Sequence, residues 1–233
     1  MVNQNKYHFG QLQVLYEDNH IIAVSKPAGM SVQPDLAKEK SLVEYVEEYL
    51  VDKYNKKGRA FVGLVHRIDK PVTGIVLFTR TSRILSRIHW LFKNREIHKG
   101  YWAITERKPD KDSDFLEHYL IKSSVKNKSY VTSSKTKGAH LAQLNYKVIK
   151  ELPNNKFLIQ VNPVTGRHHQ IRVQLSKINA PIMGDIKYSA SKPNKDKSIA
   201  LHARTLQFIH PIKNIEIFIQ APVPLTDPYK VLL

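Results

Sequence analysis

One short segment, residues 63–80, constrains the fold of this chain more than any other part of the sequence. Its apolar run over 75–78 is short enough to be a buried strand rather than a helix. The preceding turn contains Pro71, which fixes φ, and Gly74, which permits unusual backbone angles, so we expect a rigid corner. A catalytic carboxylate is often held on such a corner, and Asp69 lies there. By frequency alone, however, a lone aspartate in a turn more often caps that turn.

The charge balance of the sequence indicates a polyanionic partner. The 233 residues include 37 lysines and arginines against 20 aspartates and glutamates, which gives a formal net charge of +17. Self-repulsion of that size opposes compaction unless a polyanion neutralises the surface, so we expect a nucleic acid. A membrane surface is the competing partner, but no strongly amphipathic basic helix with an aromatic face is evident. A lysine-rich composition without functional meaning is the alternative explanation for part of the excess.

Missing residues and motifs exclude several chemistries. The sequence has no cysteine, which rules out disulfides, thiolate metal sites and cysteine nucleophiles. No motif for a serine nucleophile, a Walker loop or dinucleotide binding occurs. His66 with Asp69, and His168 with His169, lack a third ligand at a fixed spacing, so we expect no metal. Because no apolar run could span a bilayer and the first residues lack a signal-peptide core, we expect a cytoplasmic protein without membrane contact.

The hydrophobic pattern predicts short strands mixed with about three helices. Ser41 and Glu44 form a capping-box pattern at one helix start, and apolar spacing predicts helices over 82–93 and from His168. The Ser- and Lys-rich segment 123–138 is predicted to be a mobile loop or ribbon. Hairpins between strands favour an α+β fold, and without a repeat or linker we expect a single domain over 1–233. The predicted strands cover 12–16, 21–24, 75–78, 101–105, 139–149, 157–161, 199–209 and 215–219.

One carboxylate, several arginines and a tyrosine remain as candidate catalytic groups. Asp69 stays ionised if Arg67 is close, since a nearby cation favours the charged form. An ionised carboxylate can act as nucleophile or base on an electron-poor ring or at an anomeric carbon. Arg67 can reach a phosphate or stack in the place of a base, and Tyr101 offers a flat face and a hydroxyl. From spacing alone, each of these residues can equally belong to a surface salt bridge or to the core.

Four motifs follow one another along the chain. They are His66-Arg67-Ile68-Asp69 with Thr73-Gly74, Lys99-Gly-Tyr101-Trp-Ala103, Thr165-Gly-Arg-His-His-Gln-Ile-Arg-Val173, and Pro181-Ile-Met-Gly-Asp185 with Tyr188. Together and in this order they resemble the signature of RluA-type pseudouridine synthases. The resemblance covers about residues 12–222, nearly the whole chain. Gln174 and the pair Ile186-Lys187 differ from the residues common in that family, which bears on substrate details more than on activity.

The resemblance implies isomerisation of uridine to pseudouridine in structured ribosomal or transfer RNA, without cofactor or metal. It implies that Asp69 is the essential carboxylate, that Arg172 forms an ion pair with it, and that Tyr101 stacks on uracil and helps proton transfer. Arg67 would displace the target base and fill its place. Base extrusion is also expected on chemical grounds, because the glycosidic carbon is unreachable inside a stacked helix. The other residues expected to contact RNA are His66, Arg167 and His169.

The resemblance also implies the fold and the organisation of the chain. It implies a central, mostly antiparallel sheet with flanking helices and a catalytic cleft. Many relatives carry an amino-terminal S4-type RNA-binding module, which we do not expect here, and we expect a monomer. Two other functions remain open: a non-catalytic RNA-binding or RNA-folding protein, which would not need Asp69, Tyr101 and Arg172 together, and a metal-dependent nuclease, which a chelator would inactivate.

Overall fold

The computed structural model describes residues 12–35, 39–225 and 228–232, which form a mixture of strands and helices. The helices are α1 (Leu42–Lys53), α2 (Ser82–Lys93) and α3 (Gln170–Lys177), with 3₁₀ turns η2 (Ile186–Tyr188) and η3 (Tyr229–Leu232). The strands are β1 (Gln13–Glu17), β2 (Ile21–Lys26), β3 (Gly63–Leu64), β4 (Thr73–Thr79), β5 (His98–Thr105), β6 (Ser113–Ser123), β7 (Lys128–Thr132), β8 (His140–Leu152), β9 (Lys156–Pro163), β10 (Leu201–Ile209) and β11 (Glu216–Gln220).

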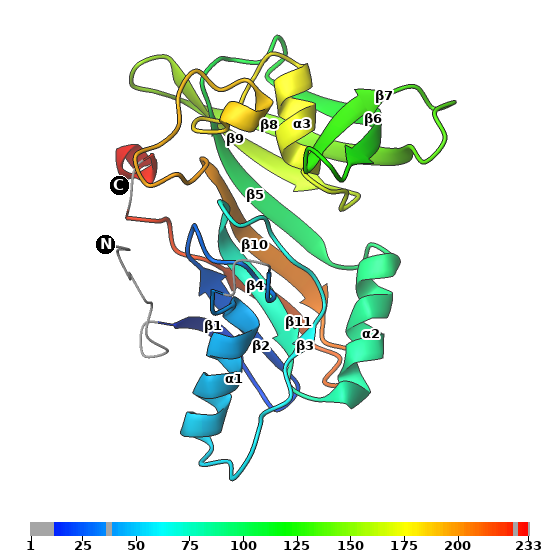
Figure 1. Ribbon diagram of the computed structural model, residues 1–233, viewed down its shortest axis with the longest axis vertical. Coiled ribbons are helices and arrows are strands. Elements are labelled where there is room, and N and C mark those ends of the chain that lie inside the picture. Colours follow the sequence, from blue (N-terminus) through cyan, green and yellow to red (C-terminus); the bar gives the residue numbers. More distant parts are fainter. Residues whose placement is uncertain (1–11, 36–38, 226–227, 233) are drawn as a thin grey trace.

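One sheet connects all of these strands. Along it they follow the order β1-β2-β4-β10-β5-β9-β8-β6-β7, while β3 pairs with β4 and β11 with β10. Among the described strands, every pairing is antiparallel except that of β4 with β10. Figure 1 shows β5 and β10 in the middle, with α1 and α2 beside the lower strands and α3 beside the upper ones. The predicted α+β fold with a mostly antiparallel sheet is therefore confirmed.

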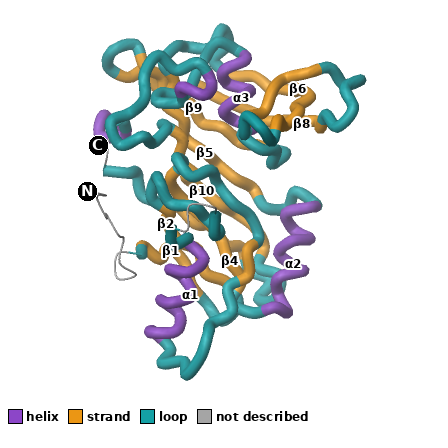
Figure 2. Tube along the Cα trace, viewed as in Figure 1, coloured by secondary structure: helices purple, strands orange, loops and turns teal. Residues whose placement is uncertain are grey.

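Strand β4 is buried along its whole length because packing covers both of its faces. Val76 and Phe78 belong to one apolar cluster, which includes α1, whereas Ile75 and Leu77 belong to a second, which includes α2. A strand covered on both faces has a continuous rather than an alternating apolar run, as the sequence shows. Figure 2 shows the resulting arrangement, with the three helices outside the strands. The predicted buried strand is confirmed.

The first residues of β4 require glycine at position 74. Gly74 has φ of 109°, and a Cβ placed there would lie 2.2 Å from the carbonyl oxygen of Ala203. That approach belongs to the parallel pairing of β4 with β10, in which Gly74 is opposite Ala203. Any larger residue would be strained and would push the two strands apart.

The helix predictions agree with the structure. For residues 123–138 we predicted a mobile loop or a ribbon, and the structure shows a ribbon. Helix α2 has the predicted bounds, and the Ser41 N–H donates to Glu44 Oε2 over 2.8 Å at the start of α1. Within 123–138, β7 pairs with β6. Its order comes from polar contacts: the buried Ser129 donates its N–H to the Tyr188 hydroxyl over 2.7 Å and its hydroxyl to the His168 carbonyl over 2.7 Å.

Candidate active site

Asp69 lies on a loop, between β3 and β4, that is held from two sides. Its carbonyl accepts the N–H of Val72 over 3.0 Å, which closes the turn. The next carbonyl, that of Lys70, accepts the N–H of Gly29 over 2.8 Å and Lys26 Nζ over 3.1 Å. The corner is therefore fixed as predicted. The carboxylate of Asp69 does not cap this turn, because it points away to another element.

Lys26 is a structural residue of this corner that sequence reasoning missed. Its side chain is buried, and Nζ donates to the carbonyls of Pro27, Met30 and Lys70 over 2.8, 2.9 and 3.1 Å. Burial lowers the pKa of Lys26 to about 7, while the nearby carboxylate of Asp69 acts in the opposite direction. Three carbonyl acceptors satisfy the whole ammonium group, so Lys26 ties the end of β2 to the Asp69 loop.

The guanidinium of Arg172, in the first turn of α3, joins two carboxylates. Nη1 donates to Asp69 Oδ2 over 2.9 Å, which is the ion pair that the resemblance implied. Nε and Nη2 donate to the two oxygens of Asp185 over 2.7 and 2.8 Å. Arg172 is only 5% exposed and Asp185 only 1%. Despite burial, the two carboxylates keep the pKa of Arg172 above its usual value, so the guanidinium remains charged.

Asp185 is the functional residue that the sequence prediction omitted. It orients Arg172 through a bidentate pair, which fixes the plane of the guanidinium and leaves Nη1 for Asp69. Its position in the fourth resembling motif was the available signal, but that motif by itself indicates no role. The geometry indicates that Asp185 positions Arg172.

His169 closes one side of the Asp69 carboxylate without adding charge. It adopts a left-handed conformation, with φ of 53°, immediately before α3. Nε2 lies 3.6 Å from Asp69 Oδ2, Nδ1 lies 3.0 Å from the Tyr188 hydroxyl, and the ring stacks on His168 at 3.7 Å between centroids. Burial lowers the pKa of His169 to about 3, so the imidazole is neutral. It acts on Asp69 as a packing group and a polar neighbour.

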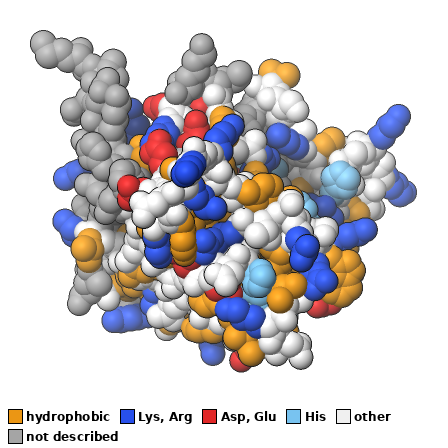
Figure 3. All heavy atoms as spheres, turned by 90° about the horizontal axis from the view of Figure 1, so that it is seen from below, with side chains coloured by type: hydrophobic (Ala, Val, Ile, Leu, Met, Phe, Trp, Pro, Cys, Tyr) orange, Lys and Arg blue, Asp and Glu red, His pale blue; other side chains and the backbone are white. Residues whose placement is uncertain are grey.

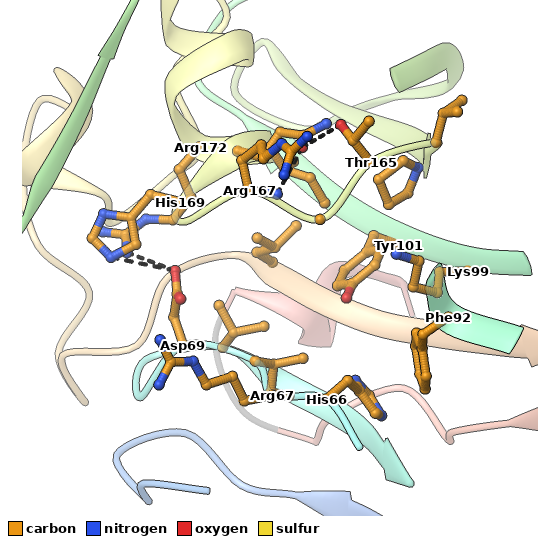
Figure 4. A pocket seen from close by; sticks show the side chains of 18 of the residues that line it. His66, Arg67, Asp69, Phe92, Lys99, Tyr101, Thr165, Arg167, His169 and Arg172 are labelled. Atoms are coloured by element: carbon orange, nitrogen blue, oxygen red, sulfur yellow. Dashed lines mark hydrogen bonds and ion pairs between the residues drawn. The ribbon is translucent and has the colours of Figure 1, made fainter. Parts of the chain in front are cut away.

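A cavity of about 600 Å³ opens beside this ion pair, between the Asp69 loop and the loop that precedes α3. Figure 4 shows Arg67 and Asp69 on the first loop, Thr165 and Arg167 on the second, and Tyr101 on β5 between them. The volume lies within the range of small-molecule sites. Burial, with a smaller contribution from Asp69, raises the pKa of Tyr101, so its phenol is protonated at neutral pH. No described residue forms a hydrogen bond with the Tyr101 hydroxyl.

The remaining predicted residues line the same cavity but differ in their freedom to bind RNA. Arg67 is exposed. Arg167 is also exposed, although its Nε donates to the Leu141 carbonyl over 2.9 Å. Nε2 of His66 accepts the N–H of Leu77 over 2.9 Å, and its ring lies 5.0 Å from that of Phe92. Burial lowers the pKa of His66 to about 3. His66 is therefore neutral, and one of its ring nitrogens already has a partner in the protein.

A second cavity, of about 530 Å³, adjoins Asp69 on its other side and is strongly basic. The ion-pair residues Asp69 and Arg172 line both cavities. Lys122, Lys187 and Lys197 line only the second. The carboxylate thus lies between two cavities, and an extended substrate can occupy both of them at once.

The described residues hold neither a cluster of metal ligands nor a membrane-spanning helix. No three or more His, Asp or Glu side chains in the described ranges gather closely enough to hold a metal ion. No helix in that part of the chain is both long enough and apolar enough to cross a membrane.

A carboxylate paired with a buried guanidinium, and a free tyrosine hydroxyl in the same cavity, are the groups of an enzyme active site. On a chain with a net charge of +17, they define the class as an enzyme that acts on nucleic acid. A protein that only binds nucleic acid would need the basic surface, but it would not need the buried ion pairs of Arg172, whose desolvation costs free energy.

Comparison with known proteins identifies the family. The model for the RNA pseudouridylate synthase family matches residues 20–177. A ribosomal large subunit pseudouridine synthase C of Rickettsia felis is 34% identical over 223 residues, 93% of this chain and 70% of that protein. A tRNA pseudouridine synthase C of Vibrio parahaemolyticus is 27% identical and covers 91% of both chains. The chain belongs to the RNA pseudouridylate synthase family, as the RluA-type motifs predicted.

The solved structures agree on the fold. Human RNA pseudouridylate synthase domain containing 4 superposes with a TM-score of 0.77 and 23% identity, covering 91% of this chain and 88% of that one. At this identity the likeness shows the pseudouridine synthase fold alone. The family makes the chain an enzyme that forms pseudouridine in RNA, and none of these findings favours the non-catalytic alternative.

Proposed function

We propose that the chain modifies specific uridines of structured ribosomal or transfer RNA, with Asp69 as its essential carboxylate. The observation that carries this proposal is the pairing of Asp69 with the buried Arg172 at the edge of a nucleotide-sized cavity. The names of the relatives support both classes of RNA. We also propose a monomer in the cytoplasm and a single catalytic domain, the latter because one sheet runs through both sides of the site.

The reaction is an isomerisation that the groups in the cavity can serve. The bond from C1′ to N1 of uridine breaks, a bond from C1′ to C5 forms, the C5 proton leaves and N1 gains a proton. Asp69, whose Oδ2 accepts from Arg172 Nη1 over 2.9 Å, can attack the sugar, attack the ring or remove a sugar proton. Tyr101 stacks on the uracil, and its protonated hydroxyl can give its proton to N1 and then take the proton that leaves C5, which restores the phenol. The target base must first leave its stack.

Unmodified transcripts test the proposal and separate the two substrate classes. The purified protein is incubated with transcripts of large-subunit ribosomal RNA and of transfer RNAs, and pseudouridine is located by mass spectrometry of the digested product. Modification at defined positions of one class identifies the substrate. If neither class contains pseudouridine after incubation, the proposal is wrong.

Arg67→Ala is expected to impair base extrusion more than RNA binding. Arg67 lies on the cavity wall beside Asp69, where its plane can fill the place of the displaced base. We expect single-turnover product formation to fall at least about tenfold, whereas the dissociation constant rises less than about threefold. Stopped-flow and filter-binding measurements give the two quantities, with the exposed Arg107→Ala as control. If the rate and the RNA affinity fall by the same factor, Arg67 only contacts a phosphate and does not act in base extrusion.

Tyr101→Phe is expected to slow the chemical step while leaving the stacking face intact. The loss of a group that helps proton transfer typically costs about a hundredfold or more. We therefore expect the single-turnover rate to fall about a hundredfold, with RNA affinity nearly unchanged. A Tyr101→Ala variant should lose affinity as well, because it also removes the ring. A phenylalanine variant with the wild-type rate would exclude the hydroxyl from proton transfer.

A further inference from the structure

Helix α2 presents to solvent a face that is both basic and aromatic. Arg83, Arg87 and Trp90 are exposed at spacings of four and three residues, which places them on one side of the helix. The opposite side is buried in the core through Ile84, Ile88 and Leu91. Trp90 is 55% exposed and is not part of the buried side of α2. An exposed tryptophan among cationic residues is typical of a recognition surface.

The charge along α2 itself has one sign. No aspartate or glutamate occurs between Arg80 and Arg95, whereas α1, beside the other face of the sheet, carries Glu44, Glu47, Glu48 and Asp52. Figure 3, a view from below, shows lysines and arginines scattered over this side of the molecule, with several acidic side chains gathered in its upper part and a few others lying singly. Among the described residues, Arg83, Lys93 and Arg95 form no ion pair.

This basic face continues into the active-site cavity. Phe92 and Lys93 from the last turn of α2, and Arg95 just after it, line the cavity that holds Asp69. From Arg83 to Lys93 the helix extends about 15 Å at 1.5 Å per residue. A polyanion that places one nucleotide in the cavity can therefore continue along α2, where it meets cations without intervening carboxylates.

We propose that the α2 ridge, formed by Arg83, Arg87, Trp90 and Lys93, is an RNA-docking surface that begins at the edge of the catalytic cavity with Lys93 and extends away from it along the helix. Trp90 stacks on an unpaired base that flanks the target nucleotide, and the cationic side chains contact phosphates. This inference rests on the proposed function and adds to it the path of the substrate. Charge complementarity favours RNA over a protein partner, because the exposed neighbours of Trp90 are Ser86, His89, Lys93 and Asn94 rather than apolar residues.

Tryptophan fluorescence tests the stacking directly, because the sequence contains only Trp90 and Trp102. Trp102 lies elsewhere, half-buried with Arg204 over its ring at 4.7 Å. In an Asp69→Asn background, Trp102→Phe leaves Trp90 as the only tryptophan, Trp90→Phe leaves Trp102, and excitation at the red edge of the tryptophan band avoids the 11 tyrosines. An unmodified large-subunit ribosomal RNA transcript should quench the first variant and leave the second nearly unchanged. Absence of quenching at Trp90, or equal quenching of both, overturns the proposal.

Affinity measured at several salt concentrations tests the rest of the ridge. Trp90→Ala should weaken binding of the same transcript roughly tenfold, since one base loses its stacking partner. Arg83→Ala and Lys93→Ala should each lower the slope of log affinity against log salt by about 0.7 to 1. Matched controls are Phe218→Ala, an aromatic residue 59% exposed on β11, and the exposed pair Lys56→Ala and Lys57→Ala beyond α1. If the control variants change the affinity and the salt slope as much as the ridge variants do, the proposal is wrong.

The outcomes also separate this inference from the proposed function. If the transcript quenches Trp90 but the wild-type protein forms no pseudouridine, the proposed function fails and the docking surface remains. If pseudouridine forms and Trp90→Ala changes neither affinity nor rate, only the docking surface is wrong. A dimer that Trp90→Ala converts to a monomer in sedimentation, without loss of RNA affinity, would assign the ridge to a second copy of the chain and overturn RNA docking.

Discussion

Asp69→Asn is expected to abolish pseudouridine formation while the protein still binds RNA. Asparagine has nearly the same shape as aspartate but carries no charge, so it can serve neither as nucleophile nor as base. We expect the single-turnover rate to fall by about 10⁴-fold or more, since the whole chemical step depends on this group. The dissociation constant should change by less than about threefold, because the basic surface remains. Rapid-quench assays and filter binding measure the two effects.

The control for this prediction is a carboxylate outside the cavity. Asp114 lies on the surface and pairs with Lys111 over 3.0 Å, so Asp114→Asn makes the same chemical change without touching the site. That variant should keep the wild-type rate. Normal turnover in Asp69→Asn would remove Asp69 from the mechanism, and its ion pair with Arg172 would then be a structural contact only.

Arg172→Met is expected to damage both stability and activity. Methionine fills much of the same volume but leaves the Asp185 carboxylate buried at 1% exposure without its bidentate partner. Breaking a buried ion pair from one side typically costs about 3–5 kcal/mol of unfolding free energy. Activity should be lost as well, because Asp69 no longer has a cation beside it. Urea unfolding followed by circular dichroism gives the free-energy difference.

A double variant separates the two effects of Arg172. Arg172→Met with Asp185→Leu removes both buried charges, and stability should recover to within about 2 kcal/mol of the wild type. Activity should remain absent, since the partner of Asp69 is still missing. Arg167→Met is the matched single control: Arg167 is exposed, so its loss should cost less than about 1 kcal/mol. If Arg172→Met also costs less than about 1 kcal/mol, the Arg172–Asp185 ion pair does not have the structural role assigned to it.

The sequence alone predicted those helices and strands that depend on residues close together in the chain. The bounds of α2 follow from its apolar spacing, the start of α1 from Ser41 with Glu44, and the burial of β4 from its uninterrupted apolar run. Gln174, which departs from the family pattern, is also explained: it is buried and donates to the Leu116 and Ala142 carbonyls. That position belongs to the core, so the departure leaves the Asp69 site intact.

The candidate site was only partly predictable, because its parts meet from distant positions in the chain. Motif order pointed to Asp69, Tyr101 and Arg172, but no spacing in the sequence indicates that Arg172 also holds Asp185. Nothing local marks Lys26 as the cation that ties two loops together. The order of β7 was equally hidden, since it depends on the contact of Ser129 with Tyr188, 59 residues away.

The chemical identity of the groups was therefore determined by the sequence: a lone carboxylate on a rigid corner, arginines, a tyrosine and a large positive charge. Only the tertiary structure decided which of these groups meet, and which of their hydrogen bonds are already used within the protein. The physical reason is that hydrophobic periodicity acts over a few residues, whereas a buried ion is stable only if partners from several elements satisfy it together. Arg172 and Asp185 show this dependence most directly, because α3 and the segment before η2 must both be in place before their two hydrogen bonds can form.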